Sequence, residues 1–268
     1  MAHRFTKMHG LGNDFVVIDA REQPVEMTAA RASAIADRQR GIGCDQLVLL
    51  EPSETADVKM RIFNADGSEV EACGNATRCV ASLLAVPATI ETLGGLLNVT
   101  PADGGAEVVL VEPRFDWDQI PLAYPLDTRD LPVAWEELAH GAAVNVGNPH
   151  IIFFVEDCDR IALDQLGPLI EHDALFPQRI NVNVASLIGD NHLKLRVWER
   201  GVGLTQACGT GACATAVAAL RAGLVHSPVK VSLPGGDLTI AWTQGSPIIM
   251  TGPATRVFEG ETDWARFG

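Results

Sequence analysis

The chain has 268 residues, of which 47% are hydrophobic and 20% charged, so it is long enough for one large domain or for two of about 130 residues each. Its formal net charge of -14, without any run of Lys and Arg, excludes a basic nucleic-acid-binding surface. The N-terminus has no apolar signal segment, and no apolar stretch reaches the ~18 residues of a membrane helix. We therefore expect a cytoplasmic protein that binds neither nucleic acid nor membrane.

Asn13, which follows a glycine, leads into the strand-like apolar run 15–18. Segment 59–74 begins as a strand, continues as a Gly-containing loop and ends in Ala-Cys-Gly, and residues 75–84 after it are typical of a helix. Segment 113–134 contains four prolines and has mixed polarity, as linkers do. The first half of the chain is thus several short strands and one helix, ending in a predicted linker.

The second half repeats this series. Asn148 again follows a glycine and precedes an apolar run, 151–155, while segment 194–209 again ends in Ala-Cys-Gly before an Ala-rich helical run, 210–220. Both matches have the same offset in the numbering, since 148 − 13 = 135 and 208 − 73 = 135. The pairs in the second match include Lys59/Lys194, Arg61/Arg196, Ala72/Ala207, Cys73/Cys208 and Gly74/Gly209. The sequence therefore predicts two copies of one module.

Cys73 and Cys208 are each predicted to stand where a loop meets a helix. A helix N-terminus has unpaired N–H groups and a partial positive charge, which bind anions and lower the pKa of a thiol. Inverting a carbon centre requires a proton to leave one face and another to arrive at the opposite face. Two modules related by an approximate two-fold axis would present one thiol to each face, and their helix N-termini would stabilise the enolate-like charge without a cofactor.

A single cysteine in an Ala-rich segment is more often a small buried apolar residue than a catalyst. The repetition of Ala-Cys-Gly at one module position favours catalysis for this pair alone. The remaining cysteines have no equivalents across the repeat and are expected to serve packing: Cys44, Cys79, Cys158 and Cys213. All six should be reduced thiols, and because no C-x-x-C pair or zinc-ligand spacing occurs, we expect no metal site.

Several strings, in order over nearly the whole chain, resemble the diaminopimelate epimerase family: HGLGNDFVVID, GIGCDQL, FNADGSEVEACGNATRC, NVGNPH, INVNVA, VWERG, ACGTGACA and MTGPATRVFEGE. The resemblance implies an α+β fold of two pseudo-symmetric modules, each a barrel-like sheet around a central helix, with the active site in the cleft between them. The modules would be residues 1–116 and 117–254, and in this family the final residues, here 255–268, typically return to the first.

The resemblance also implies an isomerase that converts LL-2,6-diaminopimelate to the meso form, in lysine and peptidoglycan precursor synthesis, with no cofactor and as a homodimer. Cys73 and Cys208 would be the acid–base pair, one thiolate and one thiol in each turnover. Backbone N–H groups would bind the carboxylate of the reacting centre from Gly74, Asn75, Gly209 and Thr210. The substrate pocket would be lined by Asn13, Gln46, Asn64, Asn148, Asn181, Glu199 and Arg200, with His150 assisting.

Within this set, Arg200 suits the distal carboxylate of the substrate, since its planar fork matches that group, and Glu199 suits an ammonium. The repeat supports three pairs as equivalent positions: Asn13/Asn148, Gln46/Asn181 and Asn64/Glu199. Each also has a plainer interpretation, because asparagines commonly serve turns and a loop arginine is often only solvated. Two positions depart from the family pattern: Ala76, where Gly is frequent, and Leu204, where Glu is frequent.

Three alternatives remain. Another racemase of the same fold, acting on proline, hydroxyproline or histidine, would not need Arg200 for a second carboxylate. A thiol redox protein would want a nearby resolving cysteine, and no C-x-x-C pair is present. A non-catalytic binding module would tolerate serine in place of both repeated cysteines.

Overall fold

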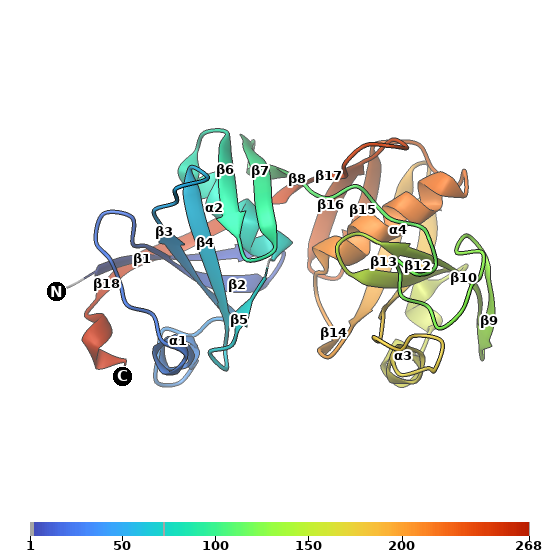
Figure 1. Cartoon of the computed structure of the whole chain (residues 1–268), viewed down its shortest axis with the longest axis horizontal. Coiled ribbons are helices and arrows are strands. Elements are labelled where there is room, and N and C mark those ends of the chain that lie inside the picture. The colour runs from blue at the N-terminus through green and yellow to red at the C-terminus, as the bar shows by residue number, and fades with distance from the viewer. Residues whose placement is uncertain (1–2, 72, 268) are drawn as a thin grey trace. The chain divides into compact units, whose positions relative to one another are not determined.

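The computed structural model describes residues 3–71 and 73–267, so Ala72 of the predicted repeat lies outside the described residues. The chain forms two compact units. Unit 1 consists of Met1–Val109 and Thr251–Gly268, and unit 2 consists of Leu110–Met250. In the described residues both units are rich in strands and have few helices, which confirms the α+β class (Figure 1).

In the described residues, unit 1 is a single curved sheet with two α-helices and one short 3-10 helix. Its strands pair in the order β18-β1-β2-β3-β4-β6-β7-β8, with β2/β3 and β4/β6 parallel and β5 on the end of β4. Helix α2 contacts β1, β2, β7 and β8, strands from both ends of that order, so the sheet curls around it. The elements are β1 (His3–Gly10), β2 (Asn13–Asp19), α1 (Ala29–Ala36), β3 (Gln46–Glu51), β4 (Val58–Asn64), β5 (Glu69–Val70), α2 (Gly74–Leu84), β6 (Ala88–Thr92), β7 (Gly95–Ala102), β8 (Gly105–Val109), β18 (Thr255–Thr262) and the short helix η2 (Trp264–Arg266).

Unit 2 has the same plan, with strands in the order β9-β10-β11-β12-β13-β15-β16 around helix α4. Helix α4 contacts β10, β11, β12, β13, β15 and β16 (Figure 1). Its alanines are buried, because small side chains let the strands approach its backbone closely. The elements are β9 (Leu131–Trp135), β10 (Leu138–Asn145), β11 (Pro149–Phe154), η1 (Cys158–Arg160), α3 (Leu163–Glu171), β12 (Asn181–Gly189), β13 (His192–Glu199), β14 (Gly203–Leu204), α4 (Gly209–Arg221), β15 (Val229–Leu233), β16 (Gly236–Ala241) and β17 (Ile249–Pro253), which contains the boundary with unit 1.

The sequence repeat is reproduced in the strand register. In the parallel pair β2/β3 Phe15 lies opposite Gln46, and in β11/β12 His150 lies opposite Asn181, so both partners keep the offset of the repeat (150 − 15 = 135 and 181 − 46 = 135). The antiparallel pairs β3/β4 and β12/β13 keep the same offset. After the helix the offset is larger, as in β6 and β15 (231 − 90 = 141). The two units therefore share one topology and one register.

Segment 113–134 differs from the predicted linker. Its residues Ile120, Leu122 and Leu131 are buried in the core of unit 2, and Arg114 forms two backbone hydrogen bonds with Asn145 of β10. The prolines suggested an open connection, but the apolar residues between them pack against the sheet. The boundaries between the two units lie between residues 109 and 110 and between residues 250 and 251. The sequence instead predicts them between residues 116 and 117 and between residues 254 and 255.

Candidate active site

The two repeated cysteines are the N-cap residues of the two central helices, as predicted. Cys73 precedes α2 and Cys208 precedes α4, and each has an extended backbone conformation. The carbonyl group of each accepts the first intrahelical hydrogen bond, from Thr77 N at 2.9 Å and from Ala212 N at 3.0 Å respectively. Residues Gly74 and Gly209 begin the helices, where the backbone N–H groups of the first turn have no acceptor within the helix. Each cysteine thus stands beside a potential anion-binding site.

Around Cys73 the structure brings together three of the predicted residues. The Cys73 thiol lies 3.8 Å from Asn13 Oδ1, and Asn75 Nδ2 donates to the same oxygen at 3.2 Å. The side chain of Asn75 is nearly buried and also accepts a hydrogen bond from Arg78 at 2.7 Å. Separately, Gln46 Nε2 donates to Asn64 Oδ1 at 2.9 Å on the adjacent strands β3 and β4.

A charged cluster that the sequence did not reveal supports Asn13. Asp45 accepts a hydrogen bond from Asn13 Nδ2 at 3.1 Å, and Arg38 bridges Asp45 and Asp14 at 2.6 Å from each. Burial raises the pKa of Asp14, but hydrogen bonds from Arg38 and Lys7 outweigh this and hold it well below the usual carboxyl range. The repeat could not reveal this cluster, because the positions equivalent to the two aspartates are Pro149 and Ile180.

Cys208 is more deeply buried than Cys73, with 4% of its surface exposed. Its sulfur accepts a hydrogen bond from Gly211 N at 3.3 Å and lies 3.6 Å from Thr210 Oγ1. Burial raises the pKa of Cys208 well above that of a free thiol, and the nearby negative charge of Glu199 raises it further. Burial also raises the pKa of Glu199, against a hydrogen bond from Thr205, which the sequence did not single out. Cys208 is therefore a protonated thiol at neutral pH.

One side-chain contact recurs in both units. Asn75 donates to Asn13 at 3.2 Å, and Asn148 donates to Thr210 at 3.3 Å. The partners of the two contacts again differ by the offset of the repeat (148 − 13 = 135 and 210 − 75 = 135). In both units, therefore, an asparagine binds the second residue of the central helix: Asn13 is the first residue of β2, and Asn148 immediately precedes β11. The repeat thus extends from the backbone to the polar side chains beside the two cysteines.

His150 is fully buried behind Asn148. Asn183 Nδ2 donates to Ile151 O at 3.0 Å and lies 3.1 Å from His150 Nδ1, so this ring nitrogen is assigned as an acceptor. The other nitrogen, Nε2, then carries the proton and donates to Asn148 Oδ1 at 2.9 Å. Both ring nitrogens are engaged, and burial lowers the pKa of His150 to about 3. The side chain that the sequence predicted to assist catalysis is neutral here and orients Asn148.

The neutral state of His150 predicts an acid sensitivity. Because the folded protein does not protonate this ring until about pH 3, whereas the unfolded chain does so near pH 6.5, the unfolded state binds more protons in that window, and stability falls as the pH falls. Between pH 7 and pH 5 this group alone should remove about 2 kcal/mol from the free energy of unfolding. Urea unfolding of the wild type and of His150→Gln measures the difference, and equal pH dependence of the two proteins would disprove it.

Asn181 and Arg200 meet at the turn between β13 and β14. Asn181 donates to Pro149 O and accepts from the backbone N–H of Arg200, both at 2.9 Å. The guanidinium of Arg200 is exposed and donates to Gln178 O at 2.9 Å, which leaves further N–H groups for a ligand. Within unit 2, Asn148, Asn181, Glu199 and Arg200 thus lie on connected elements near Cys208.

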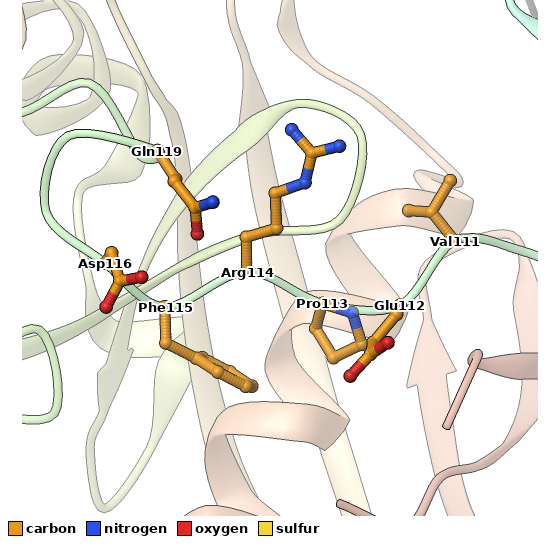
Figure 2. Close-up of a pocket in the computed structure, with 7 residues that line it drawn as sticks. All are labelled: Val111, Glu112, Pro113, Arg114, Phe115, Asp116 and Gln119. Carbon is orange, nitrogen blue, oxygen red and sulfur yellow. The ribbon is translucent and has the colours of Figure 1, made fainter. Parts of the chain in front are cut away.

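The structure also contains a shallow hollow of about 450 Å³ in unit 2, lined by residues 111–116 and 119, among them Arg114 and Phe115 (Figure 2). None of its lining residues belongs to the predicted site. Over residues 3–71 and 73–267, no three His, Cys, Asp or Glu side chains are grouped to hold a metal ion. Over the same ranges, no helix has the length and apolar character to cross a bilayer.

Known proteins resemble this chain over its full length. Residues 5–113 and 142–257 match the family model described as diaminopimelate epimerase. A protein of that name from Sphingopyxis alaskensis is 79% identical over 268 residues and covers 100% of both chains. Another, from Rhizorhabdus wittichii, is 70% identical and covers 100% of this chain and 98% of its own.

Solved structures share the fold at low sequence identity. A PhzF-family phenazine biosynthesis protein from Enterococcus faecalis has a TM-score of 0.72 at 15% identity, covering 98% of this chain and 100% of its own. A hydroxyproline epimerase from Agrobacterium vitis has a TM-score of 0.65 at 15% identity, covering 97% and 91%. The family model and the full-length relatives, together with the duplicated α+β fold, lead to one assignment. The chain belongs to the diaminopimelate epimerase family.

Proposed function

We propose that this protein converts LL-2,6-diaminopimelate to the meso form with Cys73 and Cys208 as the two acid–base groups at one α-carbon, where one thiolate removes the proton and the other thiol delivers a new one. The observation that carries the proposal is the placement of these cysteines as N-cap residues at equivalent positions of two units with the same register. The full-length relatives named diaminopimelate epimerase support the substrate. Two equivalent thiols would supply the two acid–base groups, one for each face, that a two-base inversion of a single carbon centre uses.

In this mechanism one thiolate removes the proton from the α-carbon while the opposite thiol delivers another. Cys208 is suited to begin as the donor, because burial and Glu199 raise its pKa and keep it protonated. The N–H groups at the starts of α2 and α4 would bind the α-carboxylate and stabilise the enolate-like charge that develops there. This preorganised field is the electron sink of the proposed reaction, which therefore needs no cofactor.

The remaining predicted residues would bind the rest of the substrate. Arg200 would hold the distal carboxylate through the guanidinium N–H groups that Gln178 leaves available. Glu199 would accept an ammonium group, and the amide side chains would bridge both kinds of charge: Asn13, Gln46, Asn64, Asn148 and Asn181. These roles follow the family resemblance, residue by residue.

The family resemblance also supports a location, a pathway and an oligomeric state. We propose that the protein acts in the cytoplasm, in lysine and peptidoglycan precursor synthesis, and that it forms a homodimer. Sedimentation equilibrium of the purified protein tests the dimer: a species of twice the chain mass supports it, and a monomer at all concentrations contradicts it.

A second candidate is a racemase of proline, hydroxyproline or histidine, because a hydroxyproline epimerase shares the fold. These substrates have no second carboxylate for Arg200 to bind. The two candidates are separated by offering LL-diaminopimelate, L-proline, trans-4-hydroxy-L-proline and L-histidine to the reduced protein in heavy water. We expect deuterium at the α-carbon of diaminopimelate alone. Exchange with another member of the panel but not with diaminopimelate would refute the proposed substrate.

A further inference from the structure

Glu171, the last residue of helix α3, is an acidic side chain buried to 2% exposure that the proposed mechanism does not use. Its two oxygens accept hydrogen bonds from different parts of one turn. Oε2 accepts from the indole nitrogen of Trp198 at 2.7 Å, and Oε1 accepts from the backbone N–H of Gly201 at 2.9 Å. These donors lie immediately before and after Glu199 and Arg200. One carboxylate therefore brackets two residues assigned to substrate binding.

The turn itself is tightly specified. Val202 N donates to Glu199 O at 3.0 Å, and Gly201 has a φ of +74°, a conformation that favours glycine. Helix α3 lies directly against the preceding strand, since a Cβ added to Gly167 would come within 2.4 Å of the Trp198 ring. The indole is thus packed against the helix backbone and bonded through its nitrogen to Glu171. The turn cannot shift without breaking this contact.

Burying a carboxylate is costly unless its oxygens are satisfied, so a buried acid that binds two donors indicates a specific structural requirement. Arg179 lies 3.7 Å from Oε1 and offsets part of the charge. An apolar side chain at position 171 would fill the space but leave the Trp198 and Gly201 N–H groups without their acceptors.

Arg200 is held by two further groups. Its backbone N–H donates to Asn181, and its guanidinium donates to Gln178 O. Three groups therefore fix Arg200: Asn181 holds its backbone, the Gln178 carbonyl holds its side chain, and Glu171 holds the residues on either side of the Glu199–Arg200 pair. We propose that Glu171 is a positioning residue for substrate binding, which sets the pose in which Arg200 receives the distal carboxylate of the substrate. This inference rests on the proposed function.

The test is a double-mutant cycle in kcat/KM for LL-diaminopimelate with Glu171→Gln and Arg200→Ala. The glutamine amide offers one acceptor and turns an NH2 group toward the second donor, so we expect KM to rise about tenfold while kcat changes less than about twofold. In the Arg200→Ala background the same change should reduce kcat/KM by less than about twofold, because the group it positions is gone. Asp164→Asn, on the exposed first turn of α3, makes the same charge change and should leave the kinetics unchanged.

Trp198→Phe is the second variant, in case Glu171→Gln fails to fold. It keeps an aromatic ring against Gly167 but removes the indole donor, so it should raise KM in the wild type and not in the Arg200→Ala protein. An unchanged KM in the folded variants, or a tenfold loss that persists in the Arg200→Ala background, would overturn the positioning role. No exchange of diaminopimelate by the wild type would instead refute the proposed function.

Discussion

Replacing Cys208 with alanine is expected to lower the rate of diaminopimelate epimerisation by about 10³-fold or more, and replacing Cys73 should have an effect of similar size. General acid–base groups typically contribute about 10²–10⁴-fold, and here neither thiol can do the work of the other, because each would serve one face of the carbon. Loss of either sulfur therefore interrupts both directions of the reaction. The measurement is the initial rate of LL-to-meso conversion by purified, reduced protein.

Stability should respond differently at the two positions. The Cys208 sulfur accepts a hydrogen bond from Gly211 N, whereas the Cys73 side chain forms no capping bond to α2. Alanine at 208 should thus cost about 1 kcal/mol of cap stability, and alanine at 73 less. Cys213→Ala, in the buried part of α4, is the matched control and should keep its activity. A Cys73→Ala or Cys208→Ala protein with more than a tenth of wild-type activity would show that this thiol is not essential.

The second large effect is expected at Arg200. Changing it to alanine should raise KM for diaminopimelate by about 10²–10⁴-fold, because two charge-assisted hydrogen bonds to a carboxylate contribute about 1.5–3 kcal/mol each. Arg200→Lys should be intermediate, since an ammonium lacks the planar fork. Binding of the distal carboxylate is distant from the proton transfer, so kcat should change less than KM.

Arg160→Ala provides the control for Arg200. Arg160 is an exposed arginine of the same unit that pairs only with Asp157 among its charged neighbours in the described residues. Its loss should leave KM unchanged. If Arg200→Ala also has the KM of the wild type, the distal carboxylate is bound elsewhere, and the interpretation of Arg200 fails.

The duplicated fold could be predicted because matching residues of the two halves differ by a constant 135 in the numbering. A strand register is fixed by which side chains face the core, so Phe15 and His150 occupy equivalent rungs once the repeat is recognised. The packed segment 113–134 could not be predicted in the same way. Its sequence has no match in the other half, and Ile120 and Leu122 give no periodic pattern between prolines.

Some site residues could likewise be predicted from the sequence repeat, and others depend on contacts that only the fold creates. The N-cap positions of Cys73 and Cys208 follow from a glycine and a helical run after each. Glu171 could not be found, because a glutamate in a helix is ordinarily exposed and only the fold brings it to Trp198. Asn183 is a similar case, since its effect on His150 depends on the pairing of β11 with β12.

The two-thiol account is tested most directly by the isotope content of product formed in the first few per cent of reaction in heavy water. If different groups act on the two faces, the meso product should carry one solvent deuterium at its inverted carbon from the first turnovers, while recovered LL substrate remains almost unlabelled. Meso product that keeps the original hydrogen would mean that a single base removes and returns the same proton, and the pairing of Cys73 with Cys208 would be wrong.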